Sequence, residues 1–432
     1  MGVVRSCAMT TTERPAATPA APAASGAPHE RGTPGFRRLG AALWCSGLAT
    51  FVLVYSVQGL LPTLSQQFGV SSSVASLVLS ATTGTLALAV LPLSALLESW
   101  GRARVMTWAL GISAVLALIA PLAPTFGVLV AIRALQGITL AALPALSMAH
   151  LTKEVAPRHL GGAVGLMIAG NTLGGLSGRL VATVVADVGG WRAGLAAVGV
   201  VSVVAAVAFR WLLPAATAPD PSPTRLRDLG GPLRLHLRDP GLLCLFGIAF
   251  LIMGAFVTVY NYLGFRLLAP PFSLPAALTG LIFLGYLAGG WASTGAGRLG
   301  DRFGRRPVLW ISATLALAGI WLTQPDSLVA ILAGLLLVTV GFFGAHSVAS
   351  SWVGRRSSML QGGVPAQASS LYLFAYYAGS SAGGAAGGIA FDHLGWFGLV
   401  GYVSVLLVGA LALALVLRRI PAPAPAPAPA TA

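Results

Sequence analysis

The sequence is poor in charged residues and almost lacks lysine. Only 9% of its 432 residues are Asp, Glu, Lys or Arg, whereas a typical soluble domain carries roughly 25%. The single lysine, Lys153, follows Thr152 and not a glycine-rich loop, which excludes an ATP site of the P-loop type. The cysteines Cys7, Cys45 and Cys244 have no metal-ligand spacing and predict no disulfide framework. We therefore expect no cofactor and no metal.

Long apolar segments fill most of the chain. Hydrophobic residues make up 56% of it, and a membrane-spanning helix needs about 20 mostly apolar residues. Because lipid offers no hydrogen-bond partners to the backbone, each such segment should be helical. Twelve segments qualify: 39–63, 73–97, 104–122, 125–150, 160–186, 193–213, 241–264, 275–296, 307–323, 328–350, 364–391 and 395–417. The sequence predicts an all-α integral membrane protein with twelve transmembrane helices.

Positive charge is concentrated on one side of the membrane that these twelve spans are predicted to cross. Of the 26 Lys and Arg residues, all but Arg133, Arg179, Arg192 and Arg266 lie in the terminal segments, in the loops after even-numbered spans or at the span ends that adjoin these loops. Positively charged loops stay on the cytoplasmic side, so we expect both termini to be cytoplasmic. The net charge of +15 is spread over many loops, and it predicts a lipid bilayer and no nucleic acid as partner.

A proline-rich, charged segment divides the chain into two related halves. A shift of 205 residues aligns Asp187 with Asp392, and neighbouring glycine and tryptophan residues also match. Parallel repeats of this kind predict pseudo-symmetric halves with a pathway between them. The expected domains are a disordered basic cytoplasmic tail at 1–38, a six-helix bundle at 39–213, a central linker at 214–240, a second six-helix bundle at 241–418 and a Pro/Ala-rich tail at 419–432.

The loop after the eighth span reads GRLGDRFGRR, residues 297–306. It resembles the signature loop of the major facilitator superfamily, which is thought to latch the two halves in one access state. The first-half copy, SALLESWGRA at 94–103, departs from the pattern, so the resemblance leaves open how tightly that state is held. The expected latch residues are Gly297, Asp301, Arg302, Gly304, Arg305, Glu98, Gly101 and Arg102.

Two further motifs lie in the fourth and fifth spans. Arg133, Gln136 and Gly137 resemble the R-x-x-Q-G motif of the same superfamily. Glycines at four-residue steps in the fifth span predict a flat face for close helix packing, and they resemble the superfamily's antiporter motif, although Arg179 replaces its last glycine. The packing glycines are Gly170, Gly174 and Gly178, with Gly379 and Gly383 as their counterparts in the second half.

The segments 165–179 and 346–356 are similar to the drug/proton-antiporter branch, among the arabinose efflux permease-like, YnfM-type transporters of bacterial inner membranes. The superfamily resemblance covers about residues 38–418. It implies a monomeric, multi-pass secondary transporter of the inner membrane that works by alternating access. It also implies proton-coupled export of a small-molecule substrate.

Charged side chains inside spans cost roughly 3 kcal/mol at a helix centre, so those that occur are candidates for function. Arg133 and Arg179 lie at similar predicted depth. For Arg133 the structural alternative is hydrogen bonding to backbone carbonyls, and for Arg179 it is an extended side chain that reaches the membrane interface. No Asp or Glu lies deep in any span, which argues against lipophilic cations and favours a neutral or anionic solute.

The remaining candidates are polar or aromatic residues of the spans. Asn171 and Arg179 share one stripe of the fifth span, and Tyr376 is the repeat counterpart of Asn171. His346 is either a proton carrier or a packing histidine. The substrate or coupling set is Arg133, Gln136, Asn171, Arg179, His346 and Tyr376. Further polar groups of the first, seventh and eleventh spans are Tyr55, Gln58, Tyr260, Asn261, Tyr262 and Tyr377.

Other functions are open at this point. An uncoupled facilitator or uptake permease needs no embedded carboxylate. An intramembrane enzyme would need a catalytic constellation at membrane depth, and the spans contain none. A non-transporting sensor should have a sizeable soluble domain, whereas the longest segments outside the spans are about 38 and 25 residues. Enzyme and sensor are therefore disfavoured, and neither the substrate nor the direction of transport follows from the sequence.

Overall fold

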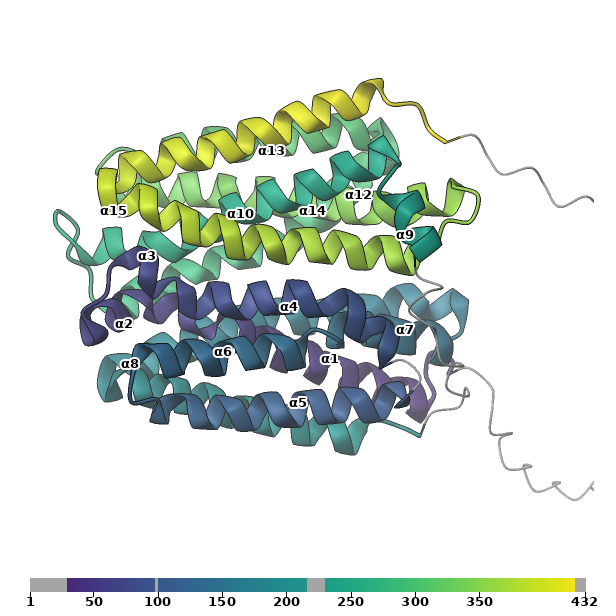
Figure 1. Ribbon diagram of the computed structural model, residues 1–432, viewed down its shortest axis with the longest axis horizontal. Helices are drawn as coiled ribbons and strands as arrows, with labels where there is room; N and C mark the ends of the chain where they lie inside the picture. The colour runs from purple at the N-terminus through teal and green to yellow at the C-terminus, as the bar shows by residue number, and fades with distance from the viewer. Residues whose placement is uncertain (1–28, 98–99, 216–229, 424–432) are drawn as a thin grey trace, which may run out of the picture.

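The computed structural model describes residues 29–97, 100–215 and 230–423, and these are almost entirely helical. Figure 1 shows α1–α8 in one bundle and α10–α15 in a second bundle beside it. The first bundle contains α1 (Pro34–Tyr55), η1 (Ser56–Leu60), α2 (Leu61–Phe68), α3 (Ser72–Ala75), α4 (Leu77–Leu96), α5 (Arg102–Ile119), η3 (Ala120–Leu122), α6 (Phe126–Leu140), α7 (Leu143–Glu154), η4 (Pro157–His159) and α8 (Leu160–Leu212).

The second bundle follows the short helix α9, which lies within the predicted linker. Its elements are α9 (Gly230–His236), α10 (Pro240–Leu268), α11 (Ala276–Leu281), η6 (Ile282–Tyr286), α12 (Leu287–Phe303), α13 (Arg305–Leu322), α14 (Leu328–Met359) and α15 (Pro365–Arg419). In the first bundle α1 begins five residues before the predicted span, because Thr33 caps it by accepting from the backbone N–H of Phe36. The predicted tail residues 1–28 and linker residues 216–229 lie outside the described residues.

The helix lengths account for all twelve predicted crossings. Within the described residues, eight helical stretches are long and apolar enough to span a membrane. Two of them, α8 and α15, contain 53 and 55 residues, whereas one crossing takes about 20. Each turns back at a glycine with positive φ, Gly190 at 75° and Gly395 at 60°, so each crosses twice. The shorter apolar helices α4 and α13 supply the other two crossings, and the predicted fold is confirmed.

Glycines let the longest helices approach backbone to backbone within each half. A Cβ on Gly174 of α8 would collide with the Leu48 backbone of α1, and one on Gly178 would collide with the Val52 backbone. A Cβ on Gly379 of α15 would likewise collide with the Phe250 backbone of α10. The α1–α8 and α10–α15 pairs therefore pack in the same way in the two halves, as the internal repeat predicts.

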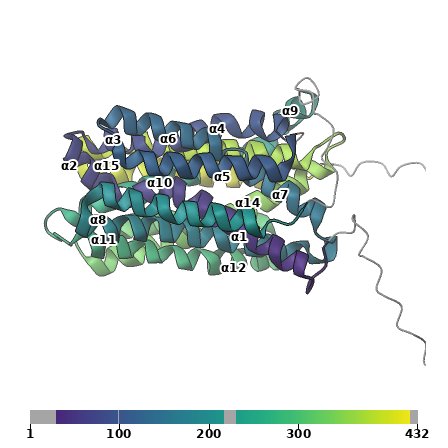
Figure 2. The ribbon, with the colours of Figure 1, turned by 90° about the horizontal axis from the view of Figure 1, so that it is seen from below.

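The halves meet through two helix pairs. The helices α3 and α4 pack against α15, and α8 packs against α11 and η6; Figure 2 shows α8 beside α11. We call the end that carries the Gly190 and Gly395 turns the turn end, and the end that carries α9 the linker end. In Figure 1 the turn end is on the left and the linker end is on the right.

Candidate functional site

Arg179 lies at the boundary between the two halves and is only 1% exposed. Its Nε donates to Gln58 Oε1 at 2.7 Å and its Nη2 donates to Tyr286 Oη at 2.9 Å, while Nη1 donates to the Gly175 carbonyl of its own helix. Gln58 belongs to η1 of the same half, whereas Tyr286 ends η6 of the other half. One guanidinium therefore holds side chains of both halves.

Three aromatic rings surround this guanidinium. Its central carbon lies 4.6 Å from the ring centroid of Tyr55, 5.2 Å from that of Phe283 and 4.3 Å from that of Tyr286. The ion pairs of the described residues are Arg158–Glu30, Arg266–Asp326 and Arg356–Asp239. Since none of them involves Arg179, its charge is stabilised by neutral dipoles and ring faces, although a buried charge is costly without a partner.

A second link between the halves runs beside the first. Gln58 Nε2 donates to Asn261 Oδ1 of α10 at 2.7 Å. The other amide atom of Asn261, Nδ2, is buried without a hydrogen-bond partner, and so is the Tyr55 hydroxyl. Buried donors without partners are rare in native structures. The Tyr55 ring faces the Arg179 guanidinium, so its hydroxyl could donate to a ligand at this boundary, whereas Asn261 Nδ2 lies against Gly384 of α15.

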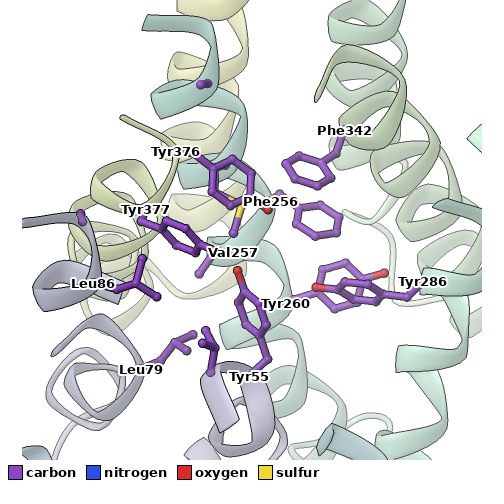
Figure 3. Close-up of a cluster of buried hydrophobic side chains, with 14 of the residues drawn as sticks. Tyr55, Leu79, Leu86, Phe256, Val257, Tyr260, Tyr286, Phe342, Tyr376 and Tyr377 are labelled. Atoms are coloured by element: carbon purple, nitrogen blue, oxygen red, sulfur yellow. The ribbon is translucent and has the colours of Figure 1, made fainter. Parts of the chain in front are cut away.

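An aromatic cluster connects Arg179 with His346. Figure 3 shows the rings of Tyr286, Phe256 and Phe342 within it. The Tyr286 ring lies 5.3 Å from that of Phe256, which stacks on Phe342 at 3.8 Å with an interplanar angle of 9°. Phe342 in turn stacks on the His346 ring at 5.8 Å. The predicted candidates Arg179 and His346 therefore lie at two ends of one continuous chain of aromatic rings.

His346 and Tyr376 are brought together at the far end of this cluster. Their ring centroids are 4.9 Å apart, and His346 comes from α14 whereas Tyr376 comes from α15. The Nδ1 atom of His346 shares a hydrogen bond of 2.9 Å with the Tyr372 hydroxyl. The imidazole is thus held by aromatic neighbours, and the described residues contain no ion pair to it.

Arg133 has a different set of partners from Arg179. Its Nη1 donates to the Leu53 carbonyl and its Nη2 to the Val54 carbonyl, each at 2.8 Å, and its Nε donates to the Val78 carbonyl at 3.4 Å. Nη1 also donates to Gln136 Oε1 at 2.7 Å. These carbonyls lie in α4 and near the end of α1, where a change to 3₁₀ geometry interrupts the regular hydrogen bonds. Arg133 thus fastens α6 to α1 and α4.

The other sequence candidates lie apart from this network. Asn171 points at α1, where a Cβ on Gly47 would collide with its Oδ1. Tyr262 donates to the Gly384 carbonyl at 2.9 Å and stacks on Phe391. The structure therefore brings Arg179, Gln58, Asn261 and Tyr55 together, joins His346 and Tyr376 to them through aromatic rings, and leaves Asn171, Arg133 and Gln136 at helix contacts.

The two signature loops have similar backbone geometry. Gly101 and Gly304 immediately precede α5 and α13, with φ of 91° and 90°, a conformation that favours glycine. Arg102 is buried, whereas Asp301 is exposed. Glu98 lies outside the described residues, so the first-half contact expected of it stays a prediction.

Asp392 forms a contact between the halves at the turn end. Its carboxylate accepts from the Ser72 hydroxyl and, at 3.1 Å, from the Ser73 backbone N–H of α3. Partial burial alone would raise the pKa of this carboxyl, but the hydrogen bonds from Ser72 and Ser73 outweigh it and hold the pKa below its ordinary value. Between Asp392 and the aromatic cluster, Ser381 donates to the Ser80 carbonyl at 2.7 Å.

The aromatic residues of the second half that complete the site were not among the candidates predicted from the sequence. These are Phe256, Phe283, Tyr286 and Phe342. A Phe or Tyr inside a span is most often a packing residue, and no spacing rule separated these rings from the others. The available signal was indirect, because a buried arginine without a carboxylate needs ring faces or dipoles around it.

Comparisons with known proteins agree with this fold. Residues 43–295 match the family described as Major Facilitator Superfamily. The chain is 40% identical over 383 residues to the uncharacterized MFS-type transporter YybF of Bacillus subtilis, covering 89% of this chain and 94% of that protein. It is also 40% identical over 382 residues to the inner membrane transport protein YnfM of Escherichia coli, covering 88% of this chain and 91% of that protein.

Solved structures show the same fold at low sequence identity. The human organic anion transporter MFSD10 superposes with a TM-score of 0.67 at 20% identity, covering 88% of this chain and 100% of that one. A bacterial homolog of the human lysosomal transporter Spinster, in an inward-facing and occupied conformation, gives a TM-score of 0.71 at 16% identity over 92% and 100% of the two chains. This chain belongs to the major facilitator superfamily, and it is a membrane transporter and not an enzyme.

Proposed function

We propose that this transporter exports a small organic anion across a bacterial inner membrane, in exchange for protons. The observation that carries the proposal is the guanidinium of Arg179, which is buried between the halves without a carboxylate partner among the described residues. A guanidinium has five N–H donors, and three of them reach Gln58, Gly175 and Tyr286. Spare donors and an unpaired charge favour an anionic ligand over a cationic one.

The positions of the contacts between the halves support entry of the solute from the linker end. The hydrogen bonds that join Asp392 to α3, Ser381 to Ser80 and Gln58 to Asn261 lie between the turn end and the aromatic cluster. The positive-inside rule places the linker end and both termini in the cytoplasm and the turn end in the periplasm. With this orientation the transporter would be closed to the periplasm, so an exported solute would enter from the linker end.

We assign the coupling proton to His346. It is the histidine whose ring contacts the aromatic cluster, through Phe342 and Tyr376. Imidazole is the side chain whose unperturbed pKa lies closest to physiological pH. A proton at His346 and an anion at Arg179 could therefore be bound at the two ends of one cluster. Coupling would result if only certain combinations of occupied and empty sites allowed the transporter to switch between its access states.

The proposal is tested with energised everted vesicles, in which the cytoplasmic face points outward and the interior is acid. A pH-sensitive dye reports proton release while aromatic carboxylates, aromatic sulfonates, sugar acids, neutral sugars and lipophilic cations are added in turn. We expect at least one organic anion to collapse the gradient and to accumulate in the vesicles. The response should be lost in Arg179→Lys, which keeps the charge but not the planar donor geometry.

Arg192→Lys is the matched control, because Arg192 is exposed and its guanidinium lies over the Trp191 ring at 4.4 Å, away from the boundary. A response to lipophilic cations alone, or one that survives in Arg179→Lys, would contradict the anion site. Accumulation of an anion without any proton release would contradict coupling and leave an uncoupled facilitator.

A further inference from the structure

We infer that Arg179 also holds the two halves together near the turn end, through contacts with Gln58 and Tyr286 that we call the turn-end gate. An aromatic anion would open this gate by accepting the hydrogen bonds that Arg179 otherwise donates to these residues. The inference rests on the proposed function, since it uses the same guanidinium. It goes beyond that function by naming the class of anion and by tying its binding to the separation of the halves.

The first step is that one side chain controls two links between the halves. Arg179 donates directly to Tyr286 at 2.9 Å. It also donates to Gln58 Oε1, which fixes the Gln58 amide with its NH₂ group directed at Asn261 Oδ1 at 2.7 Å. If the guanidinium turned toward a ligand, Tyr286 would be released and the Gln58 amide would lose the bond that orients it. Both links therefore depend on the guanidinium.

The second step is that the gate leaves no room for a ligand on the turn-end side of Arg179. Thr183, one helical turn after Arg179, lies against α11, where a Cβ on Gly280 would come within 3.0 Å of the Thr183 methyl group. A Cβ on Gly59 of η1 would also collide with the Thr183 hydroxyl. A solute must therefore approach from the opposite side, which is where the aromatic cluster lies.

The third step concerns the chemistry of the ligand that opens the gate. The rings of Tyr55, Phe283 and Tyr286 lie 4.3 to 5.2 Å from the guanidinium carbon. The Tyr55 hydroxyl is a buried donor without a hydrogen-bond partner. A planar anion on an aromatic ring could accept from the Tyr55 hydroxyl and from Arg179 while its ring packs on the tyrosine and phenylalanine faces. An inorganic anion would satisfy the donors but leave the rings uncovered.

The experiment measures the separation of the halves at the turn end. Spin labels are placed at Val188→Cys and Leu394→Cys, two exposed positions beside the turns of opposite halves (92% and 68% exposed). The native cysteines Cys7, Cys45 and Cys244 are replaced by alanine in the full-length chain, which is then reconstituted in lipid nanodiscs. Double electron–electron resonance gives the distance distribution between the labels, with and without ligand.

Without ligand, Gln58→Leu and Tyr286→Phe should each enlarge the long-distance population by about three- to tenfold, because each removes a link that opposes separation. Tyr402→Phe is the matched control: it also removes one tyrosine hydroxyl bond, to the Gly383 carbonyl, but this bond lies within the second half. The control should keep the short distance. If both gate variants also kept it, the assignment of Arg179 as a gate residue would be overturned.

Three ligands distinguish the effect of the negative charge from the effect of the aromatic ring. Benzenesulfonate should shift the labels to the longer distance, whereas the neutral benzenesulfonamide and inorganic sulfate should not. Opening by sulfate to the same extent, or no opening by benzenesulfonate while Gln58→Leu opens, would overturn the aromatic anion as the opener. These outcomes are independent of the vesicle assay, in which selective transport of cations would refute the proposed function even if the gate variants opened.

Discussion

Arg179 of α8 and Tyr286 of η6 join the two halves of the transporter through a hydrogen bond of 2.9 Å in which the guanidinium donates and the phenol oxygen accepts. The same ring also faces the guanidinium carbon at 4.3 Å. A charged residue of the first half is thus held by a neutral side chain of the second half. This contact leaves the charge of Arg179 without an ion-pair partner among the described residues, as the proposed anion site requires.

Replacing Arg179 should abolish transport without removing the protein from the membrane. We expect Arg179→Ala to lower the initial rate of substrate accumulation in everted vesicles at least about 100-fold, as removal of a charged group that contacts the substrate commonly does. Immunoblots of the same membranes should show near-normal abundance. A parallel fall in abundance and transport would instead assign Arg179 a structural role.

Arg133 should respond differently to the same substitution, although we expect Arg133→Ala to abolish transport as well. The change leaves the carbonyls of Leu53, Val54 and Val78 without this donor, at a cost of roughly 1–3 kcal/mol for each that stays unsatisfied. Purified Arg133→Ala should therefore unfold at a clearly lower temperature than the wild type in a fluorescence melting assay, while Arg133→Lys recovers part of the loss. A wild-type melting temperature would show that these bonds contribute little.

His346 should be needed for coupling but not for exchange. His346→Gln removes the titratable ring while a polar group remains close to Tyr372. We expect substrate counterflow, which requires no net proton movement, to stay within about threefold of the wild type. Accumulation driven by a pH gradient should disappear, along with its pH dependence. Equal losses of both activities would assign His346 to packing or to substrate binding.

The packing glycines should tolerate no side chain at the α1–α8 contact. Gly174→Ala places a Cβ against the Leu48 backbone, which cannot rotate away, and overpacking of this kind costs roughly 1–3 kcal/mol. Gly165→Ala is the control on the same helix, because a Cβ there meets nothing within 4 Å. Melting temperatures should fall for the first variant only, and similar values for the two would contradict close packing at Gly174.

The Asp392 contact should hold the turn end closed at every physiological pH. A carboxyl whose pKa is lowered in the folded protein contributes stability above its ordinary pKa and loses it only as the pH falls through the lowered value. The labels at Val188 and Leu394 should therefore report no Asp392-dependent opening between pH 8 and pH 5, and opening only below about pH 4.

Asp392→Asn should enlarge the open population to the same extent throughout that range, because it replaces charge-assisted acceptors for Ser72 and Ser73 with a weaker neutral one. An effect of this variant that vanished at pH 5 would mean that Asp392 titrates near neutrality, contrary to the direction of its pKa shift.

The polar half of the site could be predicted from sequence, whereas its geometry could not. Arg179, Gln58 and Asn261 are conspicuous because polar side chains inside a span are costly. Arg133 is equally conspicuous, and nothing in the sequence separated it from Arg179. Arg133 differs from Arg179 because α1 changes to 3₁₀ geometry near Leu53, where backbone carbonyls accept from Arg133. The periodic pattern of hydrophobic residues does not predict this local irregularity.

The number of crossings, the internal repeat and the scarcity of membrane-embedded carboxylates can be read from the amino-acid sequence alone. These features depend on local hydrophobicity and on charge, both of which can be read residue by residue. The contacts of Tyr286 with Arg179 and of Gln58 with Asn261 emerge only in the folded protein, because these partners are 107 and 203 positions apart in the chain. Side-chain partners across the two halves depend on how the helices pack and rotate against one another, and hydrophobic membrane helices of similar composition do not encode that rotation in their pattern.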